Sequence, residues 1–493
     1  HGPRRPRSSI RDRCIDVNDL RSAVLCLALA AIAFLVFIPH VDVRHASGSE
    51  GPTGSVPSTP EVLSPEAMAE DLQHLIETIE KVHPDPYAYT SRRTIRRMYE
   101  AALARLTEPA RPRDFFREAA RLAAAFGDGH TLVALPHRRM RAALKNGSTL
   151  LPLSVERRPT GLRIDRACKD AVDLEGRRLS VVQDRSAERL HDEIQSLISG
   201  PERYRSVQAD DQFPYYAWAL GLTDPYHVVT TSPEGTAHRD TVAGLTMLGV
   251  GSCFSNARRP AFQFERVTDD AGRTVGVMTI NSLAPTERVR RGIQNALRSV
   301  QGTPVDGIVI DLRYNRGGST ETVTHVLAPF TDGPIRLTAR KSWKISDPYK
   351  AYLKERDLGP VAYQRARSGK VIDIEYDPMP LPDTRFRFSG PVAILVGPRT
   401  FSAAVKLADV AQHYNIATIV GSETGGRPSG FGEAYPFRLP NSGFRAMASI
   451  AEYTRLNERQ DGRGVVPDVP VPDMHVGTTD VALKTAVRLV ARR

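Results

Sequence analysis

Cysteine is scarce in this chain of 493 residues, which contains four, and none of them has the spacing of a metal site. Two of them, Cys14 and Cys26, belong to the N-terminal tail. The other two, Cys168 and Cys253, can form one disulfide if the domain is exported, but connectivity does not follow from sequence alone. We expect no metal and no cofactor.

A nucleic-acid-binding motif is also lacking, although the net charge is +11. Part of this charge lies in residues 1–22, with six Arg against three Asp, and part in residues 340–370, with nine Lys or Arg against three acids. A solvated basic surface explains such runs, and attraction to an anionic envelope surface is the alternative. We therefore expect no nucleic-acid partner.

Only one long apolar run is present, from Ala23 to Ile38. It is short for a membrane-spanning helix, which needs about 20 residues, and long for the centre of a signal peptide, which has about 7–15. In both cases the Arg-rich tail, residues 1–22, stays in the cytoplasm and the rest lies outside. We favour an uncleaved signal anchor at residues 23–39, followed by a linker at 40–63. The chain would then sit in the cell membrane as a single-pass protein, or be secreted or periplasmic if the segment is cleaved.

Residues 391–426 contain a buried strand, Val392 to Val396, a Gly-Pro break, and then helical spacing that begins at Ser402. A hydroxyl at such a turn lies beside the unpaired N–H groups of a helix N-terminus, which can stabilise an oxyanion. A serine nucleophile also needs an adjacent base. The simpler role of Ser402 is an N-cap, which is common for serine.

A second motif lies in residues 305–320, where a buried strand ends in Asp311-Leu312-Arg313 and a turn follows at Asn315 to Gly318. Together with residues 400–404, Thr-Phe-Ser-Ala-Ala, it resembles the tail-specific, or carboxy-terminal processing, serine proteases and their tricorn-like relatives. The resemblance covers roughly residues 65–490.

This resemblance implies the roles of three residues. Ser402 would be the nucleophile, and the backbone N–H groups of Gly318 and Ala403 would form the oxyanion hole. A protein or peptide would be the substrate.

A candidate for the general base lies in the sequence Gly-Asp-Gly-His-Thr at residues 127–131. This loop matches the histidine motif of tricorn-like and retinoid-binding-protein-like members, in which the histidine is the base. The tricorn pattern has Ser before the histidine, whereas this chain has Gly129. His130 is therefore the expected base, and an exposed turn histidine is the alternative.

Processing proteases instead use a lysine, and the corresponding position here is Arg427. Arginine does not deprotonate in proteins, so Arg427 cannot be the base. Lys406 lies one turn after Ser402, and we expect it to face solvent or a carboxylate.

A histidine base needs a carboxylate that orients it. Tricorn-like members carry Glu three residues before a Gly-Val-x-Pro-Asp motif, where this chain has Asp461. We expect Asp461 to fill this role. Glu458 and Asp128 are the alternatives, and Asp461 can also be a simple turn residue.

The resemblance implies an α/β fold whose catalytic core is a crotonase-like or Clp-protease-like spiral of ββα units at residues 263–493. A helical domain at 64–135 and a strand-rich, PDZ-like segment at 136–262 precede it. Residues 331–390 read as a basic, Tyr-containing insert, for which a surface excursion is the default and the lining of a substrate cleft is the alternative.

The sequence therefore predicts a serine endopeptidase that cleaves peptide bonds outside the cytoplasm. The alternatives are a serine hydrolase acting on an ester or an envelope conjugate, and a non-catalytic binding protein on the same fold. The intact Ser402 and His130 argue against the last of these.

Overall fold

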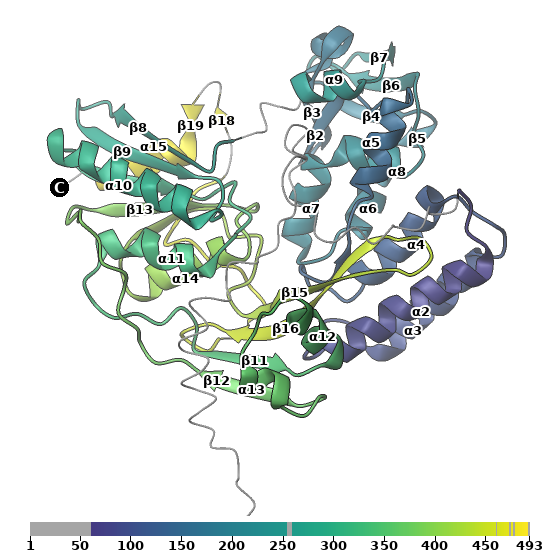
Figure 1. Ribbon diagram of the computed structural model, residues 1–493. Coiled ribbons are helices and arrows are strands. Elements are labelled where there is room, and N and C mark those ends of the chain that lie inside the picture. Colours follow the sequence, from purple (N-terminus) through teal and green to yellow (C-terminus); the bar gives the residue numbers. More distant parts are fainter. Residues whose placement is uncertain (1–60, 254–258, 460, 473–474, 477–478, 492–493) are drawn as a thin grey trace, which may run out of the picture.

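The computed structural model describes residues 61–253, 259–459, 461–472, 475–476 and 479–491. The fold is mixed α/β, as the sequence predicts (Figure 1). Within these ranges no helix is long and apolar enough to cross a membrane. The expected signal anchor at residues 23–39, with its tail and linker, lies outside the described residues.

A six-stranded sheet forms the centre of the predicted catalytic domain, in the order β17-β14-β13-β10-β9-β8. These strands span Val469–Pro470, Thr418–Gly421, Val392–Val396, Gly307–Asp311, Thr274–Ile280 and Phe262–Thr268. All neighbours pair in parallel except β8, which is antiparallel to β9. Because the carboxyl ends of parallel strands meet at one edge, the loops after β10 and β13 lie side by side there.

Helices cover both faces of this sheet (Figure 1). They are α10 (Thr286–Gly302), α11 (Thr320–Leu327), α14 (Ala403–His413) and α15 (Val481–Val490). Alternate strand residues such as Ile308 and Ile394 pack with α10, α11 and α14, whereas Val309 and Leu395 pack with α15. The continuous apolar strands predicted from sequence are thus buried on both faces, as a parallel sheet requires.

Three helices open the described chain: α2 (Pro65–Val82), α3 (Arg92–Arg105) and α4 (Pro112–Ala124). Ser64 caps the start of α2, because its hydroxyl accepts the Ala67 N–H at 3.3 Å and Pro65 is the first helical residue. The apolar faces of α2 and α4 enter a large core that they share with the middle segment.

The middle segment contains a second six-stranded sheet, in the order β2-β3-β4-β6-β7, with β5 paired to β4. Its strands are Leu153–Arg158, Gly161–Ala167, Arg178–Val182, Tyr226–Thr231, Ala237–Val242 and, for β5, Arg185–Ser186. The helices α5 to α9 span His137–Lys145, Ala187–Ser196, Glu202–Asp211, Phe213–Ala219 and Met247–Cys253. The PDZ-like character of this segment and the three domain boundaries stay predictions.

A β-hairpin consists of β15 (Gly430–Arg438) and β16 (Arg445–Thr454), and β16 reaches the N-terminal part by pairing with β1 (Leu132–Val133). The insert at 331–390 also joins this sheet. Its strands β11 (Arg340–Lys344) and β12 (Val371–Glu375) extend from β16. The helices α12 (Asp347–Glu355) and α13 (Val361–Arg365) lie between β11 and β12 in the chain. The insert is therefore part of the fold rather than a surface excursion.

Two short 3₁₀ helices and two short strands complete the set of elements: η1 (Lys169–Leu174), η3 (Ala328–Phe330), β18 (His475–Val476) and β19 (Thr479–Asp480).

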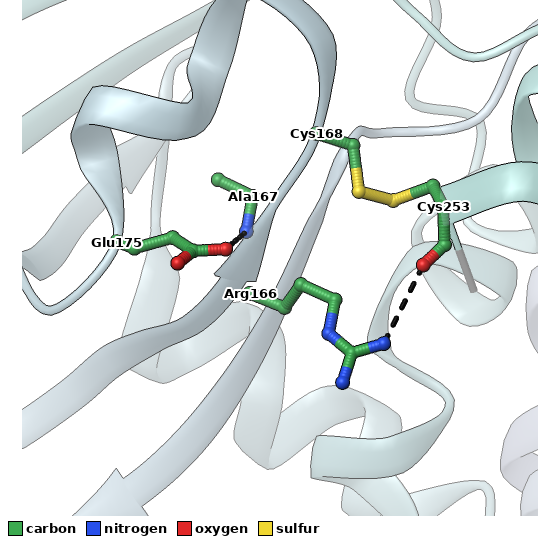
Figure 2. The surroundings of a disulfide bond; sticks show 5 residues. All are labelled: Arg166, Ala167, Cys168, Glu175 and Cys253. Carbon is green, nitrogen blue, oxygen red and sulfur yellow. Dashed lines mark hydrogen bonds between the residues drawn. A yellow bond between two sulfur atoms is a disulfide. The ribbon is translucent and has the colours of Figure 1, made fainter. Parts of the chain in front are cut away.

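Cys168 and Cys253 form the disulfide that the sequence allows (Figure 2), with their Cα atoms 5.8 Å apart. The bond ties the end of α9 to the residue that precedes η1. Beside it, the Arg166 guanidinium donates to the Cys253 carbonyl at 3.5 Å.

The disulfide gives a first prediction. It closes a loop with a sequence separation of 85, and the chain-entropy model assigns such a loop a stabilisation of about 4.6 kcal/mol. We expect a variant with Cys168→Ser and Cys253→Ser to melt several degrees below the wild type, and reductant to lower the melting temperature of the wild type only. Equal melting temperatures in oxidising buffer would show that the bond does not stabilise the fold.

Candidate active site

Ser402 lies on the sharp turn between β13 and α14, at the carboxyl edge of the central sheet. Its φ of 54° and ψ of −126° are strained for a residue with a side chain, a conformation typical of a nucleophile at a strand-to-helix turn. The N-cap alternative fails, because the Ser402 hydroxyl makes no capping hydrogen bond. The side chain is therefore free to face other groups.

Asn315 organises the neighbouring turn after β10. Its buried side chain donates to the Ile280 carbonyl at 2.9 Å and accepts the Gly317 N–H at 2.8 Å. Its own carbonyl accepts the Phe401 N–H at 3.0 Å. One asparagine thus joins the turn after β10 to the turn that carries the serine.

Two glycines of this turn allow the close approach. A Cβ on Gly317 would lie 2.8 Å from the Ser402 Cβ and 3.1 Å from the Ala403 nitrogen, and a Cβ on Gly318 would lie 2.6 Å from the Leu283 carbonyl carbon. Both have positive φ, 104° and 140°. In the described part of the chain, the N–H groups of Gly318 and Ala403 donate to no protein acceptor. They remain available to an incoming oxyanion.

His130 lies against the serine. Its Nε2 is 3.1 Å from the Ser402 Oγ, although 272 residues separate them in sequence. The Phe401 ring supports the imidazole, with centroids 5.0 Å apart. A Cβ on Gly129 would lie 2.6 Å from the tip of that ring, which explains why this chain has glycine where the tricorn pattern has serine.

Asp128 is the carboxylate beside this histidine. One carboxylate oxygen of Asp128 accepts the backbone N–H of His130 at 3.1 Å and lies 3.8 Å from the ring Nδ1. The other oxygen accepts the hydroxyls of Thr131 and Ser449, each at 2.6 Å. His83 Nε2 lies 3.4 Å from the second oxygen. Burial raises the pKa of Asp128, but the imidazoles of His130 and His83 outweigh it and hold that pKa well below its usual range. Asp128 is therefore ionised.

The other two candidate carboxylates lie elsewhere. Asp461 is on an exposed turn, where it accepts the Arg463 N–H at 3.1 Å, which is the turn role considered as its alternative. Glu458 is exposed at a φ of 56°. Among the residues placed in the structure, neither contacts His130, and of the three only Asp128 does.

The structure also shows the surroundings of Arg427 and Lys406, the two cations considered for the role of a lysine base. Arg427 donates to the Gly462 carbonyl at 2.8 Å and covers the Tyr89 ring at 4.5 Å. Lys406 was expected to face solvent or a carboxylate, and the Glu433 carboxylate attracts it. It is partly buried, with its Nζ 4.0 Å from the centroid of the Tyr453 ring.

Helix α7 of the middle segment supports the site in a way that the sequence did not reveal. Tyr204 stacks on Phe401 with centroids 4.1 Å apart. The Asp211 carboxylate binds Arg316, from the glycine turn, at 2.7 Å and Arg399, from the serine turn, at 2.9 Å. The sequence signal is limited to Arg316 in the glycine turn and Arg399 before the serine, which call for an acidic partner without saying where it lies.

Comparisons with known proteins give the class to which this fold belongs. Residues 274–471 match the sequence model of peptidase family S41. The protein is thus a serine peptidase by family, which confirms the enzyme class that the sequence predicts. A search of curated proteins finds no significant match.

Two solved structures of CPAF share this fold. Mature CPAF complexed with lactacystin is 16% identical, with a TM-score of 0.59, and the match covers 86% of this chain and 97% of that chain. A mutant of CPAF is 14% identical, with a TM-score of 0.61 and coverages of 86% and 96%. The photosystem II D1 C-terminal processing protease is 15% identical with a TM-score of 0.44, and the match covers 86% and 97%. At these identities the CPAF likeness shows the fold alone.

Proposed function

We propose that this chain is a tail-specific endopeptidase of the tricorn-like type, in which Ser402 is the nucleophile and His130 is the general base. The observation that carries the proposal is the distance of 3.1 Å between His130 Nε2 and Ser402 Oγ. That distance lies within the reach of a direct proton transfer. Arg427, at the position of the family's lysine, cannot accept a proton.

The geometry supports acyl transfer in two steps. Ser402 Oγ attacks the peptide carbonyl while His130 Nε2 takes its proton, and the N–H groups of Gly318 and Ala403 hold the oxyanion. His130 then gives the proton to the leaving amine, and a water that His130 deprotonates releases the acyl group. Asp128, rather than Asp461, orients the imidazole and stabilises its charged form.

The proposed site of action is outside the cytoplasm. The disulfide between Cys168 and Cys253 supports this, because disulfides persist in oxidising compartments and are rare in the cytosol. We expect protease added to intact spheroplasts of the host to digest the chain beyond residue 50. Full protection would contradict this location.

Digestion of an unfolded protein such as casein tests the peptidase itself. The wild type should release peptides that mass spectrometry identifies, and Ser402→Ala should release none. Hydrolysis of an ester substrate without any peptide cleavage would instead favour the ester or envelope-conjugate hydrolase.

The oxyanion hole gives a second prediction. Replacing Gly318 with Val should lower turnover by roughly 10²-fold or more, as expected for loss of one oxyanion donor. The Val side chain would strike the Leu283 carbonyl and displace the N–H. Gly333→Ala is the matched control, because a Cβ there meets no atom within 4 Å. Unchanged turnover in a folded Gly318→Val protein would show that the turn has a structural role and no role in catalysis.

A further inference from the structure

Four side chains beside His130, which we call the Lys406 cluster, are not used by the mechanism: Lys341, Lys406, Glu433 and Tyr453. The Lys341 ammonium donates to one oxygen of Glu433 at 2.6 Å, and the Tyr453 hydroxyl donates to the other. Lys406 lies over the Tyr453 ring. The cluster holds two cations and one anion, so its formal charge is positive.

The Lys406 cluster borders the reacting groups. A Cβ on Gly432 would lie 3.4 Å from the Tyr453 ring and 3.9 Å from His130 Cε1, so this glycine separates the two rings. On the other side, the Lys406 N–H donates to the Ser402 carbonyl at 3.2 Å, which places Lys406 one helical turn after the serine. A group bound to the cluster would thus be close to the scissile bond.

The Lys406 ammonium lacks a direct anionic partner among the described residues. Within the described ranges it forms no hydrogen bond or ion pair, and the Glu433 carboxylate is already shared by Lys341 and Tyr453. Burial lowers the pKa of Lys406 to about 8, against the opposing attraction of Glu433. A partly buried cation in this position costs free energy that an incoming carboxylate would recover.

The cluster is also open to a substrate. The exposed fraction of the Glu433 side chain is 35%, and Lys406 and Tyr453 are partly exposed. The bonds within the cluster hold Glu433 and Tyr453 in place, so Lys406 is the member that is free to bind a new anion.

We propose that Lys406 is a specificity-determining residue that selects substrates with a carboxylate next to the scissile bond. This carboxylate is either an Asp or Glu side chain or the free carboxyl terminus of the peptide. The inference rests on the proposed function, since it concerns the substrate of the same site.

The test uses the full chain and quenched peptides built on a sequence that the wild type cleaves. Matched peptides carry Glu, Gln or Lys at each position flanking the cleaved bond, and each is made with a free and an amidated carboxyl terminus. We compare the wild type with Lys406→Met, with the charge reversal Lys406→Glu, and with Lys354→Met as a control on the exposed face of α12.

We expect the wild type to prefer one carboxylate-bearing peptide over its Gln or amide counterpart, and Lys406→Met to lose about tenfold to hundredfold in kcat/KM on that peptide alone. Lys406→Glu should favour the Lys peptides, and Lys354→Met should match the wild type. A preference lost on amidation identifies the carboxyl terminus, and one lost with Gln identifies the side chain.

Two results would overturn the inference. One is a wild type that cleaves Glu and Gln peptides, free or amidated, equally well. The other is a folded Lys406→Met protein that has lost activity on every peptide, which would make Lys406 part of the catalytic machinery. A wild type that cleaves no peptide at all would instead count against the proposed function, so the two failures are distinguishable.

Discussion

Replacing His130 with Ala is expected to lower peptide cleavage by several orders of magnitude, as much as replacing Ser402 with Ala. The two losses should be similar because a nucleophile and its base act as one unit, and removal of either disables both. Steady-state turnover of each variant on one quenched peptide measures this. His227→Ala is a matched control, because His227 is exposed on the sheet of the middle segment and its side chain hydrogen-bonds the Thr241 hydroxyl on the neighbouring strand, away from the Ser–His pair.

An active His130→Ala protein would overturn the assignment of the base. Lys406 would then be the group to test, because it follows Ser402 by one turn and its pKa is lowered to about 8 by burial. Arg427→Ala should be far milder than either change, since Arg427 packs on Tyr89 and takes no proton.

The second large effect concerns Asp128. Asp128→Asn keeps the volume of the side chain but removes the negative charge beside His130, so the imidazolium that forms during attack loses its counter-charge. We expect turnover to fall by about two orders of magnitude or more. Asp461→Asn is the matched control on an exposed turn and should leave turnover unchanged.

The melting temperature of both variants separates chemistry from folding, because Asp128 also accepts the hydroxyls of Thr131 and Ser449. A large loss in Asp461→Asn and none in Asp128→Asn would restore Asp461 as the orienting carboxylate.

Local patterns predicted much of the fold. The strand Val392–Val396 has the predicted bounds, because it is an apolar run that ends at a glycine and a proline. The start of α2 carries a local signal of the same kind, a capping serine followed by a proline. Family resemblance supplied Ser402 and His130 as candidates, but not the distance between them.

The carboxylate that lies beside His130 could not be chosen from sequence. Asp461 was favoured by its spacing from a closing motif, whereas the carboxylate in contact with His130 is Asp128, two residues away in the same loop. Its partner Ser449 lies 321 residues along the chain and reaches it only through the register of β16 with β1. Such contacts depend on tertiary pairing, which local spacing does not encode.

For the same reason, the sequence did not predict that the middle segment contacts the active-site turns, and it did not predict the Lys406 cluster. Asp211 bridges two arginines that lie in separate motifs, and no periodic pattern marks it as their partner. Lys341 and Glu433 come from strands that both pair with β16, and the insert that carries Lys341 looked like a surface excursion.

Labelling with a fluorophosphonate probe, followed by mass spectrometry of the modified peptide, tests the central claim that Ser402 is activated by His130. Only an activated serine reacts, so the probe does not depend on knowing the substrate. The wild type should carry the label on Ser402, Ser402→Ala should carry none, and His130→Ala should react far more slowly. A folded wild type that stays unlabelled, or a His130→Ala protein that labels at the wild-type rate, would contradict the account.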